Sequence, residues 1–176
     1  MHKLFTTLVA TLAWGLGAAQ AEEVYTIGEI NSYKAQPAFL EPYKKGMDLA
    51  LAQINLTGGV NGKKLVLVTR DDNGNPADAV RAADELLTRE KVDVLMGSFL
   101  SHVGLALTDY AQQKKRFFLA AEPLTDKIVW ENGNRYTFRL RPSTYMQVAM
   151  LVPEAAAMKK KRWAIVYPNY EYGQSA

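Results

Sequence analysis

Apolar residues along the chain follow two alternating patterns. The first is a short run that is apolar throughout or alternates with polar residues, as is typical of strands. It occurs at residues 24–30, 64–70, 92–96, 116–120, 135–140 and 162–167. The second repeats apolar residues every three or four positions, as is typical of helices with one buried face. It occurs over residues 40–54, 80–87, 103–110 and 146–157, and a short helix is expected near residues 128–130.

Strands and helices that alternate in this way predict an α/β fold. Helices of this length can connect neighbouring strands by right-handed crossovers, which produce a mostly parallel sheet. We find no internal repeat, low-complexity run or coiled-coil heptad that would indicate another architecture.

Several of the predicted helices begin at polar residues that can cap them. Asn75 precedes Pro76, which suits the first turn of a helix. Ser101 and Ser143 occupy equivalent positions before two later helices, so each is expected to cap its helix. Pro153 lies within the last of these helices and is expected to kink or split it.

Two consecutive aspartates, Asp71 and Asp72, follow the second predicted strand. Aspartate near a helix start most often forms turns and caps, and this interpretation is favoured. A metal site is the less favoured alternative, because paired carboxylates can also bind a cation. We therefore expect neither a metal nor a cofactor.

The first 21 residues predict an export signal. A short basic start, His2 and Lys3, precedes a mostly apolar stretch at 4–17, and small residues flank residue 20. A membrane helix fits less well, because the apolar stretch is too short and is interrupted by polar residues. Cleavage is expected after Ala21, which would leave a periplasmic protein that is not embedded in the membrane.

The charge balance and the absence of cysteine exclude some classes of function. Removing the signal takes away Lys3 and no acidic residue, so the formal net charge falls from +3 to +2. That is too near neutral to indicate nucleic-acid binding, and the single basic run, 159–162, lies where a helix should end. Without cysteine there is no disulfide, thiol nucleophile or thiolate metal site.

An enzyme would need a nucleophile with a base within reach. Ser101 and His102 are adjacent in sequence, and adjacent residues on a helix do not face each other. The only other histidine, His2, lies in the export signal, and residues 97–101 do not complete a Gly-x-Ser-x-Gly motif. We therefore expect that the protein is not an enzyme, and an exported hydrolase is the least favoured alternative.

The stretch from residue 92 to residue 106 predicts half of a binding site. A buried strand ends at Gly97, a turn with two serines follows, and a helix begins near Ser101. The first turn of a helix has unpaired backbone N–H groups, and these point outward at the carboxyl end of the strand. Such a place suits the carboxylate of a small ligand.

Five stretches of the sequence, in this order and spacing, resemble the substrate-binding proteins of branched-chain amino-acid-type ABC transporters. They are Ile54-Asn55 with Gly58-Gly59-Val60-Asn61-Gly62, Asp71-Asp72-Asn73-Gly74-Asn75-Pro76, Gly97-Ser98-Phe99-Leu100-Ser101, Phe138-Arg139-Leu140-Arg141-Pro142-Ser143 and Tyr170-Glu171-Tyr172-Gly173. The resemblance implies the type I periplasmic-binding fold, in which two lobes with Rossmann-like parallel sheets flanked by helices close on a ligand. Residues 22–141 would form most of the first lobe, and residues 142–176 only the incomplete start of the second.

The resemblance also implies a set of ligand-binding residues. Ser101 would hold the ligand carboxylate, Phe39 would line the wall of the first lobe, and Tyr172 would reach across from the second. A second contacting loop, residues 120–125, would contribute further positions, and His102 lies beside the serine. The full set is Phe39, Ser101, His102, Ala121, Glu122, Thr125 and Tyr172.

Each of these positions also has a purely structural interpretation. Ser101 could be only a helix cap, Phe39 only a core residue, and Tyr172 only an aromatic residue beside a turn. Glu122 could meet a ligand ammonium group, although an acidic residue in such a loop more often faces solvent, and His102 is expected to face solvent by default.

The resemblance implies an exported solute-binding protein that delivers its ligand to the membrane domains of an ABC transporter. The expected ligand is a branched-chain or related amino acid, or another small or aromatic acid. The loop sequence Ala120-Ala121-Glu122-Pro123 departs from the Ser-Pro-Gly-Ala-Thr type run common in the family, so leucine, isoleucine or valine is not specified. A sensory protein that reports its ligand to a membrane receptor is the alternative.

Overall fold

The computed structural model describes residues 23–176, so the predicted export signal, residues 1–21, lies outside them. The apolar runs form a five-stranded sheet in the order β2-β1-β3-β4-β5, and every neighbouring pair is parallel. The strands are β1 (Val24–Asn31), β2 (Lys64–Asp71), β3 (Val94–Gly97), β4 (Phe118–Ala120) and β5 (Thr137–Arg139). The expected α/β fold with a parallel sheet is confirmed.

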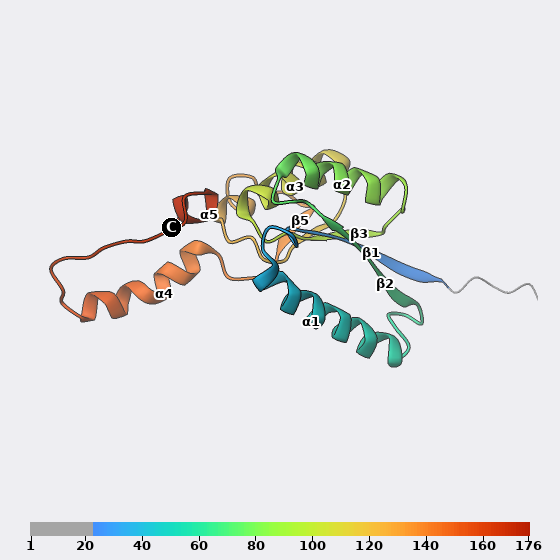
Figure 1. Cartoon of the computed structure of the whole chain (residues 1–176), viewed down its shortest axis with the longest axis horizontal. Helices are drawn as coiled ribbons and strands as arrows, with labels where there is room; N and C mark the ends of the chain where they lie inside the picture. Colours follow the sequence, from blue (N-terminus) through green and yellow to red (C-terminus); the bar gives the residue numbers. More distant parts are fainter. Residues whose placement is uncertain (1–22) are drawn as a thin grey trace, which may run out of the picture.

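Two helices, α2 (Pro76–Thr88) and α3 (Ser101–Lys114), cover one face of the sheet (Figure 1). The main core lies between this face and the two helices, and its fully buried side chains include Leu86, Leu107 and Phe118. Apolar residues on the inner stripe of each helix thus bury the face that their periodicity predicted.

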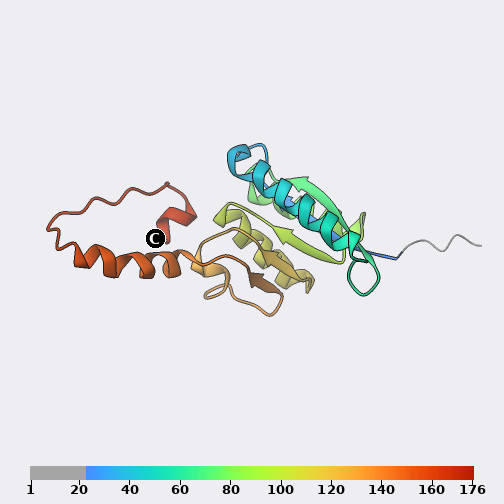
Figure 2. The same cartoon turned by 90° about the horizontal axis from the view of Figure 1, so that it is seen from below.

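The helix α1 (Pro37–Leu56) lies on the opposite face (Figure 1). Seen from below, it runs over one part of the sheet and does not cover β5 (Figure 2). Leu40 is the buried residue of this helix, and Phe138 on β5 is 51% exposed. The two faces of the sheet are therefore covered unequally.

The remaining elements are η1 (Asp126–Ile128), α4 (Thr144–Ala157) and α5 (Glu171–Gln174). Helix α4 extends away from the sheet, and the chain then returns so that α5 lies near the end of α3 (Figures 1 and 2). No helix in the described range, 23–176, is long and apolar enough to cross a membrane.

The predicted helix starts are confirmed at Asn75 and Ser143. The side chain of Asn75 accepts hydrogen bonds from the amides of Ala77 and Asp78, and Ser143 accepts one from Met146. Pro153 does not split its helix, because α4 is continuous across it.

The predicted strand at residues 162–167 is wrong. This segment has no strand assignment, and Ile165 and Val166 are 81% and 96% exposed. A strand needs a hydrogen-bonded neighbour, and no β-pairing of this segment is found among the described residues. Its alternating pattern is therefore not sufficient to make it a strand here.

Candidate ligand-binding site

The carboxyl ends of the parallel strands meet at one edge of the sheet, and this edge carries most of the predicted ligand residues. The turn after β3 leads into α3, and the loop after β4, residues 121–125, lies next to it. Ala121 donates its amide hydrogen to the carbonyl of Gly97 at 2.6 Å, and Glu122 donates to the carbonyl of Ser98 at 3.2 Å. These bonds continue the β3–β4 pairing and hold the loop against the turn. In open α/β sheets this edge is where ligands bind.

Ser101 joins the turn to the loop. Its Oγ accepts hydrogen bonds from the amides of Leu124 and Thr125, both at 3.2 Å, and the residue is 1% exposed. Ser101 is the first residue of α3 and Leu100 is the N-cap residue, without a side-chain cap. The prediction that Ser101 caps the helix is therefore wrong: its backbone is already helical, and its hydroxyl turns to the loop.

Arg139, at the end of β5, supports the same loop and was not predicted as a site residue. Its guanidinium donates to the carbonyl of Leu124 at 3.0 Å and to the carbonyl of Thr125. Burial lowers the pKa of Arg139, and the charge of Asp126 opposes that effect. A charged residue at the end of a predicted strand, next to the expected ligand edge, was the signal in the sequence that could have indicated this role.

Thr125 links the loop to α5. Its buried hydroxyl donates to Glu171 Oε1 at 2.9 Å, and Lys127 Nζ lies 3.1 Å from the same oxygen. Neither Glu171 nor Lys127 was predicted as a site residue, because a separation of 44 residues leaves no local pattern that pairs them. The structure therefore brings Ser101, Thr125 and the segment that carries Tyr172 together.

A cavity of about 250 Å³ adjoins Thr125 and Lys127. An aromatic pair, Trp130 and Tyr145, lines it with ring centroids 5.4 Å apart. This volume is below the roughly 300–1,000 Å³ of most ligand pockets. The cavity alone is thus smaller than a usual complete ligand pocket.

Glu122 does not face solvent, contrary to the favoured structural interpretation. Its side chain is 15% exposed and its Oε2 lies 3.4 Å from Arg141 Nη1. Burial raises the pKa of the Glu122 carboxyl, while the charge of Arg141 and its hydrogen bond act in the opposite direction.

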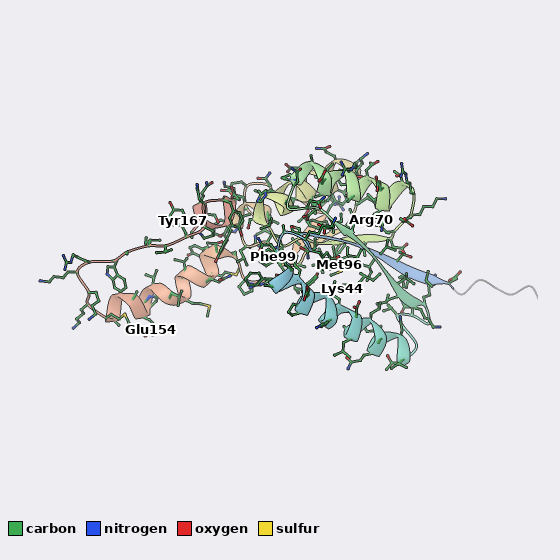
Figure 3. All side chains as sticks on the ribbon, viewed as in Figure 1. Lys44, Arg70, Met96, Phe99, Glu154 and Tyr167 are labelled. Carbon is green, nitrogen blue, oxygen red and sulfur yellow. The ribbon has the colours of Figure 1, made fainter. Side chains whose placement is uncertain are left out.

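Phe39 is not a core residue, because it is 61% exposed. Its ring stacks on Phe99, with centroids 5.2 Å apart. Phe99 lies two positions before Ser101 and, as Figure 3 shows, close to the start of α1. The pair places an aromatic surface beside the turn that leads into α3.

His102 does not face solvent either. Its Nε2 lies 3.2 Å from the carbonyl oxygen of Gly74, and its ring packs edge-on against Tyr170 at 5.7 Å. Tyr170 in turn lies 6.0 Å from Tyr172, which is half-buried. His102 therefore connects the turn after β2 with the segment that carries Tyr172.

The turn interpretation of Asp72 is supported by its contacts. Its Oδ1 accepts hydrogen bonds from Ser32 Oγ at 2.6 Å and from the amide of Gly74 at 2.7 Å. Asp71 likewise accepts from the amide of Asn73 at 2.7 Å. No group of three or more metal-ligating side chains arises among residues 23–176.

Glu29 is a buried carboxyl that sequence reasoning did not single out. It is fully buried near the end of β1, and Tyr33 donates to its Oε2 at 3.0 Å. Burial raises the pKa of Glu29 to about 7, despite the hydrogen bond from Tyr33, which acts in the opposite direction. Its position in an otherwise partly alternating strand gave no sign of complete burial.

Comparisons with known proteins show the family and the fold of the chain. A family model described as periplasmic binding protein matches residues 11–176. The Leu/Ile/Val-binding protein homolog 7 of Brucella melitensis biotype 1 is 28% identical over 184 residues, which cover 99% of this chain and 45% of that protein. The chain thus spans less than half the length of this curated relative.

Two solved structures share the fold. A substrate-binding protein of an ABC transporter from Desulfitobacterium hafniense, in complex with Leu, has a TM-score of 0.75 and 23% identity over 87% of this chain and 44% of that one. A solute-binding protein of an ABC transporter from Rhodopseudomonas palustris BisB5, in complex with 3,4-dihydroxy benzoic acid, has a TM-score of 0.77 and 24% identity over 86% and 41%. The expected type I periplasmic-binding fold is confirmed.

Proposed function

The chain belongs to the periplasmic binding protein family, and from this premise we propose that it is part of an extracytoplasmic solute-binding protein of an ABC transporter. Its ligand is a small molecule with a carboxylate, either an amino acid or a small aromatic acid. The two structures with the same fold hold leucine and 3,4-dihydroxy benzoic acid, and both molecules are carboxylic acids.

The arrangement around Ser101 carries this proposal. Its hydroxyl oxygen already accepts two amide hydrogens, so the hydroxyl proton remains for an acceptor such as a carboxylate oxygen. The first turn of α3 begins at the same residue, and the positive end of its dipole favours an anion there. A hydroxyl donor and a helix start at one sheet edge together suit an acid.

Residues 22–141 form most of one lobe in this proposal, and residues 142–176 form the start of the second lobe. Ligand held between the lobes favours the closed form, and the membrane domains of the transporter recognise that form before the ligand is released to them. Ser101, Ala121, Thr125 and Phe39 contribute from the first lobe, and Tyr172 contributes from the second.

A thermal-shift screen of the full-length protein tests the proposed function. The panel contains leucine, 4-hydroxybenzoate and other small acids, each paired with its amide or ester. We expect at least one acid to raise the melting temperature while its amide or ester does not, because only the acid supplies a carboxylate. Calorimetry then gives the affinity. Stabilisation by amides and acids alike would contradict the proposed carboxylate anchor.

A further inference from the structure

The two hydroxyls that meet at the loop after β4 have opposite hydrogen-bonding roles. Ser101 Oγ accepts from the amides of Leu124 and Thr125, and no bond donated by it is found in the described part of the chain. Thr125 Oγ1 instead donates to Glu171. A hydroxyl has one proton and two lone pairs, so Ser101 can only donate further and Thr125 can only accept further.

Glu171 determines the direction of the Thr125 hydroxyl. Lys127 Nζ lies 3.1 and 3.2 Å from the two carboxylate oxygens of Glu171, whose side chain is 15% exposed. An ammonium group can only donate hydrogen bonds, so the oxygens of Glu171 act as acceptors toward Lys127. The proton between Thr125 and Glu171 must therefore come from Thr125.

The same contact holds α5 on the loop. Glu171 is the first residue of α5, next to Tyr172, and its bond to Thr125 joins residues 46 positions apart. A second hydrogen bond, from Ser175 Oγ to Thr144 Oγ1 at 3.3 Å, joins the end of α5 to the start of α4. Ser101 and Thr125 are 1% and 0% exposed, so a ligand can contact both hydroxyls only when a neighbouring segment moves.

We propose that Glu171, paired with Lys127, is a positioning residue of the ligand site. It orients the Thr125 hydroxyl so that this hydroxyl can only accept a hydrogen bond from the ligand, and it holds α5, which carries Tyr172, against the loop after β4. This rests on the proposed function in one respect, namely that a ligand binds at Ser101. The consequence for selectivity is that the site favours acids with a hydrogen-bond donor beside the carboxylate, since the donor pairs with Thr125 while the carboxylate pairs with Ser101.

Hydrogen exchange of the full-length protein without ligand tests whether Glu171 holds α5 against the loop after β4. Glu171→Gln should speed amide exchange in both residues 121–126 and residues 170–175, because the ion pair with Lys127 is lost. Glu154→Gln makes the same chemical change on the exposed surface of α4 (Figure 3) and should leave both segments unchanged. Unchanged exchange in Glu171→Gln would overturn the proposal, whether or not any tested acid binds.

A charge exchange tests the role in orienting Thr125. In the double variant Lys127→Glu with Glu171→Lys, the ion pair remains, but a lysine now donates to Thr125 and frees the threonine proton. The amide hydrogens of residues 121–126 and 170–175 should therefore remain protected from exchange with solvent. The preference for leucine over 4-methylpentanoate, its analogue without the amino group, should fall about two- to tenfold. Retained protection with an unchanged preference would overturn the orienting role.

Discussion

At Ser101, one side-chain oxygen accepts hydrogen bonds from two amides of another segment. Ser101→Ala leaves the amides of Leu124 and Thr125 without this partner, so we expect the free energy of unfolding to fall by about 1–3 kcal/mol. Ligand binding should weaken by a similar amount, about 1–3 kcal/mol, because the proposed donor to the carboxylate is also lost. Urea unfolding and calorimetry measure the two effects.

Ser98→Ala is the matched control for this change. Ser98 is also buried, but its Oγ has only a long contact, 3.5 Å, to the carbonyl of Leu100. Its removal should affect stability much less than removal of the Ser101 hydroxyl. Equal losses for the two variants would show that the bonds to Leu124 and Thr125 contribute nothing specific.

Glu29 should make the stability of the protein depend on pH. Burial raises its folded-state pKa to about 7, above the ordinary value of 4.5. Between these two values the unfolded chain releases the proton and the folded chain keeps it, so stability falls as pH rises from about 4.5 to about 7 and then levels off. The shift corresponds to a loss of up to about 3 kcal/mol.

Glu29→Gln keeps the shape and cannot ionise, so its unfolding free energy should change less over this pH range. The neighbouring Asp72 also has a pKa raised by burial, and Lys44 acts to lower the pKa of Glu29, so only the difference between the two proteins isolates Glu29. Parallel pH profiles of the two proteins in urea unfolding would contradict the assignment.

At the scale of elements, Gly97 ends β3 in a conformation that other residues rarely adopt. Its φ is +125°, and a Cβ atom there would lie 2.0 Å from the carbonyl oxygen of Ile30. Gly97→Ala should therefore lower the free energy of unfolding by about 3 kcal/mol or more, measured by urea unfolding. Gly46→Ala within α1 meets no atom within 4 Å and should instead stabilise by about 0.5–1 kcal/mol. A small effect at Gly97 would contradict this close approach.

The start of α2 gives a second prediction at this scale. The side chain of Asn75 accepts from the amide of Ala77 at 2.8 Å, so Asn75→Ala should lower the unfolding free energy by about 1 kcal/mol. Asn75→Asp retains an acceptor and should lose little. Thermal unfolding followed by circular dichroism measures both, and equal melting temperatures for all three proteins would contradict a capping role.

Periodicity and capping residues predicted the helices, including α4, and the strands that pair with a neighbour among the described residues. The start of α2 at Asn75 was predicted because its cap involves residues only two and three positions away. The segment 162–167 has an equally good strand pattern, but Trp163 and Ile165 remain 57% and 81% exposed. A pattern specifies which face of a strand is apolar, and it does not specify the strand that must lie beside it.

At the scale of the molecule, the loop after β4 joins parts of the chain that are distant in sequence. The resemblance to the substrate-binding proteins placed Ser101 and Thr125 in one ligand site. It did not predict that Ser101 would accept from the loop, or that Glu171 would pair with Thr125 from 46 residues away. Such side-chain pairings depend on the distance and direction of atoms after folding, which periodicity does not describe.

The unequal packing of the chain predicts where a protease cuts first. Thr144 is the buried residue of α4, and residues 159–162 are exposed and lie outside any helix or strand. Segments with few buried contacts open at low free energy and are cut readily. Limited trypsin digestion of the 176-residue chain should therefore cleave within 159–162 first and release an intact fragment that contains the sheet, as seen by mass spectrometry. Lys44 is the internal control, because its backbone lies within the 20-residue helix α1. First cleavage at Lys44 would mean that α1, with its single buried residue, is held less firmly than the segment after α4.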